Sequence, residues 1–339
     1  MLNLPEPSAE SLDSYYNSIK DRIEQALYNS LLHQKIKNYL TTLKIKELIT
    51  SKPAELISIH NQLILLLDSQ FSINDYNNYI IFKSKPKESR TSDEQNLIDY
   101  YEPVIKEVKK VFNYNEFISS HKKTSYNLAQ ILNRNTCTYC NRIYTITVNK
   151  KSKKTNKYND KGRITRPQFD HWFSKNKYPF LALSFFNLIP SCSICNASLK
   201  GDADFDISTH IHPYIDNPIN DFKFSFRFKD VYESNVIIKA IANSKIATSL
   251  AEFKIEEVYD AHSNLELKDL LELKFKYSED YLDTLFNETF KSMDISEKEA
   301  YRLTFGAEYD ELNFHKRPFS KFKKDIIEEL RRIDRRDNK

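Results

Sequence analysis

The four cysteines of this chain fall in two closely spaced pairs, Cys137-Thr-Tyr-Cys140 and Cys192-Ser-Ile-Cys195. Two C-x-x-C pairs supply four thiolates, which is a complete ligand set for a tetrahedral Zn²⁺ ion. The start of the chain, MLNLPEPSAE, lacks the features of an export signal. We therefore expect a cytoplasmic protein in which the cysteines hold a structural zinc ion rather than disulfides. The alternative is a set of buried cysteines that bind no metal.

The residues between and just after these pairs could carry out chemistry of their own. Asp170-His171 and Asn187 lie between the pairs, Asn196 follows the last cysteine, and Lys200 comes soon after. The intervening segment is much longer than the roughly 15 to 20 residues of an ordinary zinc ribbon. We therefore expect the zinc to hold a separate active site closed, and to stabilise the fold rather than to catalyse.

The order of these residues resembles the HNH endonucleases, and specifically the zinc-containing branch of that family. The motifs stand here as CTYC, FDHW and NLIPSCSICNASLKG, between Thr136 and Gly201. The resemblance implies a ββα-metal domain that hydrolyses phosphodiester bonds of nucleic acids. It also implies that Asn187 ties down a loop and orients the histidine rather than touching substrate. The third letter of the name HNH stands for a residue that is histidine in some members of the family. In this chain that residue is Asn196.

Phosphodiester hydrolysis explains why these residue types are needed. A neutral imidazole can take a proton from water at neutral pH, so His171 is the expected general base. Asp170 and the side-chain carbonyl of Asn196 are oxygen ligands for a hard cation, and we expect catalytic Mg²⁺ or Mn²⁺ there. Taken singly, each residue has an ordinary structural explanation, such as a turn, a helix cap or a hydrogen-bonded histidine.

Basic residues concentrate in one polar stretch beside the Asp-His pair and in a second cluster near the end of the chain. Lysine and arginine contact phosphates without reading the base sequence, so these clusters predict DNA binding of low sequence specificity. The alternative is a set of solvated surface lysines. The predicted phosphate contacts are Lys150, Lys151, Lys153, Lys154, Lys157, Arg163, Arg166, Lys200, Lys316, Arg317 and Lys321.

Two short motifs outside the core add a wider resemblance. His212-Pro213-Tyr214 and the segment from Arg317 to Lys321 are similar to motifs of HNH nucleases in bacterial anti-phage defence, of the Septu and retron-associated types. This resemblance implies a separate ATPase partner that gates the nuclease. The chain has only 3 glycines, so neither a G-x-G-x-x-G dinucleotide loop nor a G-x-x-x-x-G-K-[ST] phosphate loop can be written in it.

The elements that must position these residues predict an α+β fold. Residues 1–133 show helical periodicity, with Ser8 as a first cap, and form the expected scaffold or partner-docking region. Residues 134–220 form the zinc-stapled nuclease domain, where Arg142–Val148 and Ile164–Phe169 are expected to pair in a hairpin that leads to Asp170. Residues 221–339 contain a second hairpin, in which Phe222–Phe228 pairs with Asn235–Ile241, and further helices.

Composition sets the limits of this interpretation. The chain has 339 residues, 40% hydrophobic and 29% charged, which is typical of a globular protein of two or three domains. Its net charge of +4 is too small to indicate nucleic-acid binding by itself. No apolar run is long enough to cross a bilayer, and we expect no membrane association. A zinc-dependent nucleic-acid-binding or scaffold protein without catalysis, and an RNA-cutting HNH nuclease, are the alternative functions.

Overall fold

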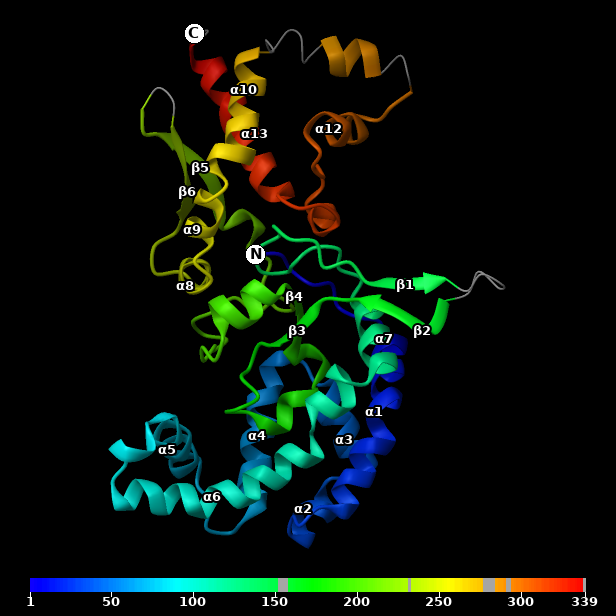
Figure 1. The fold of residues 1–339 in the computed structure, drawn as a ribbon, viewed down its shortest axis with the longest axis vertical. Coiled ribbons are helices and arrows are strands. Elements are labelled where there is room, and N and C mark those ends of the chain that lie inside the picture. Colours follow the sequence, from blue (N-terminus) through cyan, green and yellow to red (C-terminus); the bar gives the residue numbers. More distant parts are fainter. Residues whose placement is uncertain (152–157, 231–232, 277–283, 291–293, 338–339) are drawn as a thin grey trace.

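The computed structural model describes residues 1–151, 158–230, 233–276, 284–290 and 294–337. The molecule is elongated, and its three tiers follow the order of the chain (Figure 1). N-terminal helices form one end, short strands and helical turns form the middle tier, and a strand pair with longer helices forms the other end.

The N-terminal tier is helical because its apolar residues recur at three- and four-residue spacing. Ser8 caps the first helix, as predicted, and its side chain accepts a hydrogen bond from the backbone N–H of Ser11. Tyr15, Ile19 and Ile23 share the buried face of this helix. The helices are α1 (Ala9–Asn29), α2 (Gln34–Tyr39), α3 (Thr42–Thr50), α4 (Pro53–Leu67), α5 (Ile73–Ser84), α6 (Ser92–Val111) and α7 (Lys122–Leu132).

The strand that ends in the Asp-His pair lies in the middle tier. This strand, β3 (Gln168–His171), pairs antiparallel with β4 (Leu188–Ser191), so that Asp170 lies opposite Ile189. A short helix, η5 (Ile194–Lys200), follows β4 and ends at Gly201, as predicted. The φ of 51° at Gly201 is a left-handed conformation that glycine adopts without a Cβ clash.

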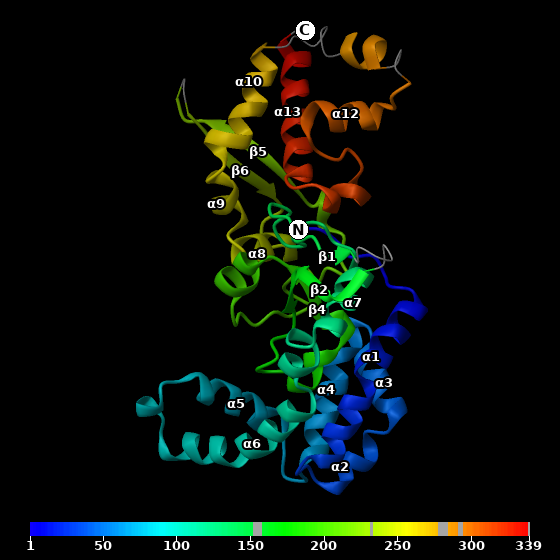
Figure 2. The same ribbon diagram turned by 45° about the vertical axis from the view of Figure 1, so that its right-hand side comes forward.

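The predicted hairpin between Arg142–Val148 and Ile164–Phe169 is found only at one residue pair, and its link to Asp170 is wrong. Of the first segment only Val148 takes part in a strand pair, opposite Thr165, and the strand that carries Asp170 pairs with β4 instead. The observed neighbouring pair is β1 (Val148–Lys151) with β2 (Tyr158–Thr165), which projects sideways from the middle tier in Figure 1 and lies in front of that tier in the turned view of Figure 2.

Burial explains why the hairpin prediction failed. Tyr144 and Ile146 are 51% and 42% exposed, so the alternation around them does not mark a face that packs on the core. Leu188–Pro190 is a continuous apolar run and is fully buried. A strand buried on both faces shows such a run instead of alternation, and β4 is therefore the partner that covers β3.

The C-terminal tier contains the second hairpin, and here the predicted pairing is confirmed. β5 (Phe222–Phe228) pairs antiparallel with β6 (Ser234–Ala240). Phe222 and Phe224 are buried, whereas Phe228 at the far end is 56% exposed. Asp325 of the last helix accepts a hydrogen bond from the backbone N–H of Phe224 and so joins that helix to β5. The helices are α8 (Lys245–Glu252), α9 (Ile255–Asp260), α10 (Lys268–Lys276), α12 (Glu297–Phe305) and α13 (Ser320–Asp337).

The fold is α+β, mostly helical with small antiparallel strand pairs, as predicted for the class. One continuous cluster of buried apolar side chains extends through all three tiers. The division of the chain at residues 134 and 221 therefore stays a prediction. Among the described residues, no helix is both long and apolar enough to cross a membrane.

Candidate active site and metal centre

The four cysteines come together in the middle tier, between the segment after α7 and the short helix after β4. Their sulfur atoms all lie within 4.8 Å of one another, and all four side chains are buried and outside any disulfide. In a tetrahedral zinc site with Zn–S bonds of about 2.3 Å, neighbouring sulfurs lie about 3.8 Å apart. The predicted four-cysteine cluster is confirmed, and it could hold a structural metal such as zinc.

The backbone around the sulfurs is also suited to a metal. The N–H of Arg142 points at the sulfur of Cys140, and the N–H of Cys195 points at that of Cys192, both at 3.4 Å. Burial raises the pKa of the Cys137 thiol, because a thiolate there loses its water. A cation bound by all four sulfurs supplies the missing charge compensation, so the donor set fits a metal of the zinc type.

Asp170 and His171 line a cleft of about 490 Å³ near this cluster. Asn196 and Lys200, from the short helix after β4, line the same cleft, and so does Arg166. The structure therefore brings three of the four predicted catalytic residues, Asp170, His171 and Asn196, to one cavity.

His171 is held in one orientation by the loop between β3 and β4. Its Nε2 lies 3.0 Å from the carbonyl oxygen of Ala182, and its ring lies edge-on to Tyr114 at 4.4 Å between centroids. Because a carbonyl can only accept, Nε2 carries the proton and Nδ1 keeps its lone pair. Burial lowers the pKa of His171 to about 3, helped by the nearby charges of Lys175 and Lys200, so the ring is neutral at pH 7.

Asp170 is buried and receives a hydrogen bond at each carboxylate oxygen. Tyr139, which lies between the cysteines of the first pair, donates to Oδ2 at 2.6 Å. Lys200 Nζ lies 3.3 Å from Oδ1 and donates to the backbone oxygen of His171 at 2.7 Å. Burial raises the pKa of Asp170, and Lys200 and Tyr139 oppose that shift. Lys200 lines the cleft, but its side chain is 1% exposed and already pairs with Asp170, so its contact with a substrate phosphate stays a prediction.

Asn187 does not reach the cleft. Its Oδ1 accepts from the N–H of Phe173 at 2.6 Å, and its Nδ2 donates to the carbonyls of Phe173 and Leu181. Leu181 directly precedes Ala182, whose carbonyl binds His171. Asn187 thus joins the two ends of the loop that orients the histidine, which is the role that the resemblance implies for it.

Asn196 is half-buried at the edge of the cleft. Its Nδ2 donates to Gln168 Oε1 at 2.8 Å. Within the described part of the chain no hydrogen bond uses its Oδ1, so this carbonyl oxygen can serve a ligand. Each carboxylate oxygen of Asp170 also keeps a lone pair. The donor set therefore suits a hard cation that retains most of its waters, as Mg²⁺ does.

The predicted phosphate contacts around β1 and β2 are only partly placed. Lys153, Lys154 and Lys157 lie outside the described residues. Lys150 is exposed, Arg166 lines the cleft, and Arg163 lies over the ring of Tyr126 at 5.9 Å. Lys151 belongs to β1.

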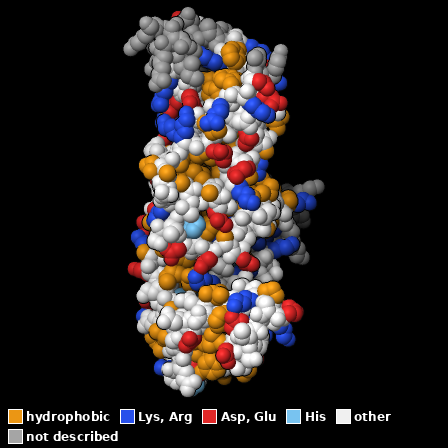
Figure 3. Space-filling model, turned by 90° about the vertical axis from the view of Figure 1, so that its left-hand side faces the viewer, with side chains coloured by type: hydrophobic (Ala, Val, Ile, Leu, Met, Phe, Trp, Pro, Cys, Tyr) orange, Lys and Arg blue, Asp and Glu red, His pale blue; other side chains and the backbone are white. Residues whose placement is uncertain are grey.

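The second basic cluster does not form the predicted surface. Lys321 is 4% exposed and pairs with Asp325 at 2.9 Å, because α13 packs this side chain against β5. Arg317 pairs with Glu308 at 3.3 Å, and Lys316 is exposed. On the face shown in Figure 3, basic and acidic side chains are interspersed, and no large area carries one sign.

Sequence reasoning missed three residues of the site. Tyr139 was visible only as a variable position within C-x-x-C, and Tyr114 lies far upstream, just after α6. Lys175 lines the cleft and follows His171 by four residues, which is a weak signal in a lysine-rich chain. No family model matches this chain, and no curated protein or solved structure matches it either.

Proposed function

We propose that this chain is a metal-dependent HNH endonuclease that hydrolyses DNA with low sequence specificity. One observation carries the proposal: Asp170, His171 and Asn196 line one cleft beside a cluster of four cysteines. The order of elements also supports it, because a strand pair followed by a short helix is the arrangement that a ββα-metal core requires.

The residues can divide the chemistry as follows. His171 presents an unprotonated Nδ1 and can accept the proton of an attacking water, while the Ala182 carbonyl fixes its tautomer. Asp170 and Asn196 would hold Mg²⁺ or Mn²⁺. Such a cation, when bound, stabilises the charge that develops on the phosphate and the leaving oxygen. Lys200 and Tyr139 favour the charged form of Asp170 and hold its carboxylate in place.

The biological setting belongs to the same proposal. The His212-Pro213-Tyr214 motif supports a role as the effector of a bacterial anti-phage system. In the structure His212 is buried and packs on Trp172, directly after the Asp-His pair, at 4.5 Å between ring centroids. An ATPase partner that gates cutting fits a nuclease whose own sequence has no nucleotide-binding loop.

A zinc-dependent nucleic-acid-binding protein without catalysis is the second candidate. The observation that favours it is the carboxylate of Asp170, because both of its oxygens already have protein donors. Such a protein would bind DNA and cut nothing.

Conversion of supercoiled plasmid to nicked or linear forms tests the proposal. Wild type should cut with Mg²⁺ or Mn²⁺, and His171→Ala should cut about 10²- to 10⁴-fold more slowly, because it lacks the general base. His33→Asn, an exposed histidine at the start of α2, should cut like wild type. Equal cutting by wild type and His171→Ala would reject this active site. Binding without any cutting would favour the second candidate, and preference for labelled RNA would change the substrate.

A further inference from the structure

A second cavity adjoins the cleft of Asp170 and His171. Its volume is about 220 Å³, and it lies between the end of α6 and the loop that follows β3. Tyr114 and Lys175 line both cavities, so the two are neighbours along one surface. Ala182, whose carbonyl holds His171, also lines the second cavity. A nucleic-acid strand that passes through the cleft can therefore continue into this cavity.

The second cavity contains two lysines that form no ion pair among the described residues. Lys109 and Lys175 are both partly buried, and neither forms an ion pair in the described part of the chain. The ammonium of Lys175 lies over the ring of Tyr114 at 5.2 Å. Burial lowers the pKa of Lys109, and the charges of Lys83 and Lys175 lower it further, although Glu102 opposes this. Burial also lowers the pKa of Lys175, and Asp202 opposes that shift. The two like charges are thus compensated only in part, by Glu102 and Asp202 and without an ion pair, so a bound anion would stabilise them.

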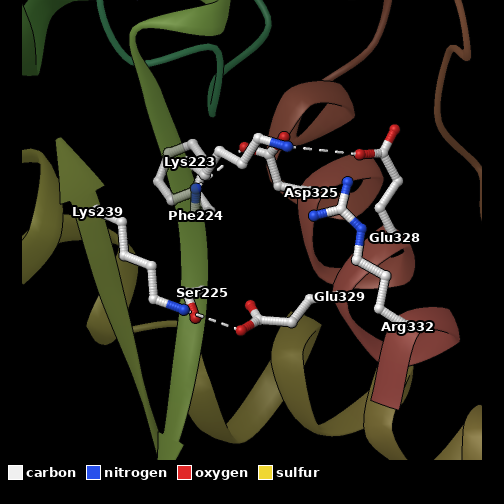
Figure 4. Close-up of a pocket in the computed structure, with 8 residues that line it drawn as sticks. All are labelled: Lys223, Phe224, Ser225, Lys239, Asp325, Glu328, Glu329 and Arg332. Carbon is white, nitrogen blue, oxygen red and sulfur yellow. Dashed lines mark hydrogen bonds and ion pairs between the residues drawn. The ribbon is translucent and has the colours of Figure 1, made fainter. Parts of the chain in front are cut away.

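Two neighbouring lysines on helix α6 and two lysines of a third cavity do form ion pairs. On the same helix α6, Lys106 lies 3.6 Å from Glu102 and Lys110 pairs with Glu107. A third cavity, between β5 and α13, also contains lysines (Figure 4). There Lys223 points at Glu328 and Lys239 at Glu329, at 3.8 and 2.9 Å, so their charges are compensated within the protein.

We propose that the cavity of Lys109 and Lys175 is a subsite for a backbone phosphate next to the one that is cleaved. The proposal rests on the proposed function and adds a substrate-binding role for helix α6, which the sequence analysis treated as part of a scaffold or partner-docking region. The two ammonium groups contact the phosphate and position the strand, and they read no base. The ring of Tyr114, which packs on His171, separates this phosphate from the reacting one.

Salt-dependent binding of labelled oligonucleotides tests the subsite. The measurement uses His171→Ala protein, so that no substrate is consumed, and adds Lys109→Gln or Lys175→Gln. Each should raise Kd by roughly tenfold, because each removes a charged hydrogen bond to the phosphate. Each should also reduce the slope of log K against log salt by about 0.7 for single strands and about 0.9 for duplex. Lys106→Gln, an exposed lysine on the same helix, should change neither quantity appreciably.

The outcomes separate the subsite from the function. If wild type cuts plasmid and the two glutamine variants bind like Lys106→Gln, the subsite is wrong and the nuclease stands. If wild type neither binds nor cuts, both proposals fall. Lys109→Arg and Lys175→Arg guard against misfolding, because they keep the charge and should keep wild-type Kd. If the arginine variants lose as much affinity as the glutamine variants, the loss is structural and the subsite is overturned.

Discussion

The Asn187 side chain connects the fold to the proposed chemistry without touching the cleft. It is fully buried, and its side chain forms three hydrogen bonds, all to backbone groups of Phe173 and Leu181 in the loop between β3 and β4. Buried backbone groups that lose a partner cost free energy that water cannot restore. Asn187 therefore acts on His171 through the position of the Ala182 carbonyl, and we expect its removal to affect stability and cutting together.

Replacing Asn187 with alanine should lower the free energy of unfolding by about 2–4 kcal/mol, because Phe173 and Leu181 lose their partners in a dry environment. Urea unfolding followed by fluorescence measures this change. Asn176→Ala is the matched control, since Asn176 lies in the same loop but is exposed, and its side chain donates to the exposed carboxylate of Asp202 instead of to buried backbone groups. Its effect should stay within about 0.5 kcal/mol. Similar losses from both variants would show that the loop does not depend on Asn187.

At the scale of single residues, the motifs could be read from the sequence, but the contacts that each side chain makes in the fold could not. The cysteines could be predicted because a C-x-x-C pair places its own two sulfurs close together. The pairing of Asp170 with Lys200 and Tyr139 depends on three segments that meet only in the folded chain. The predicted phosphate contact of Lys321 failed for the same reason. A lysine in a basic run looks exposed in the sequence, but here it is buried beside Asp325 of the same helix.

The main elements of the site are β3, β4 and the short helix that follows, and the cluster of four cysteines brings them to the first cysteine pair. Tyr139 lies within that pair and donates to Asp170 on β3. The backbone of Thr138 also donates to Pro190 on β4 at 3.2 Å. A metal bound by all four cysteines would therefore fix the segment that supports the carboxylate of Asp170.

Two kinds of chelation should therefore have different effects. Weak chelation that removes Mg²⁺ should stop plasmid cutting and leave Tm unchanged, because few protein groups hold that cation. Strong chelation that strips zinc should lower Tm by about 5–10 °C, because the metal no longer joins the two C-x-x-C pairs. Thermal unfolding with zinc content measured in parallel checks both, and added zinc should restore Tm. An unchanged Tm after complete zinc loss would show that the cluster is not structural.

Elements were predictable where one period dominated the sequence. The alternating phenylalanines of β5 and the helical spacing of α1 gave correct elements. Pairing at the centre failed because a four-residue buried run such as Leu188–Ser191 carries no period. The exposed alternation of Tyr144 and Ile146 resembled a strand more strongly than the true strand did.

At the scale of the whole molecule, the N-terminal helices pack directly against the loop of the site. His60 on α4 contacts Tyr178 and Phe180 of that loop, with ring centroids 5.1 and 5.9 Å away. Tyr15 of α1 donates to the carbonyl of Leu183 in the same loop, at 2.8 Å. The helical tier is thus a support for the loop that carries the His171 contact, and whether it also docks a partner stays a proposal.

This packing makes stability depend on pH through His60. Burial lowers the pKa of His60 to about 3 from an ordinary value of 6.5. Between these values the unfolded chain binds a proton that the folded chain does not, so stability is complete above pH 6.5 and falls as pH falls toward 3. His60→Phe fills the aromatic site without titrating, and should remove about 1.4 kcal/mol of that loss per pH unit. Urea unfolding of both proteins between pH 7.5 and 4.5 measures the difference between their free energies of unfolding. The carboxylates titrate alike in both proteins, so their contribution cancels in that difference. Parallel pH profiles for the two proteins would show that His60 is protonated in the folded state.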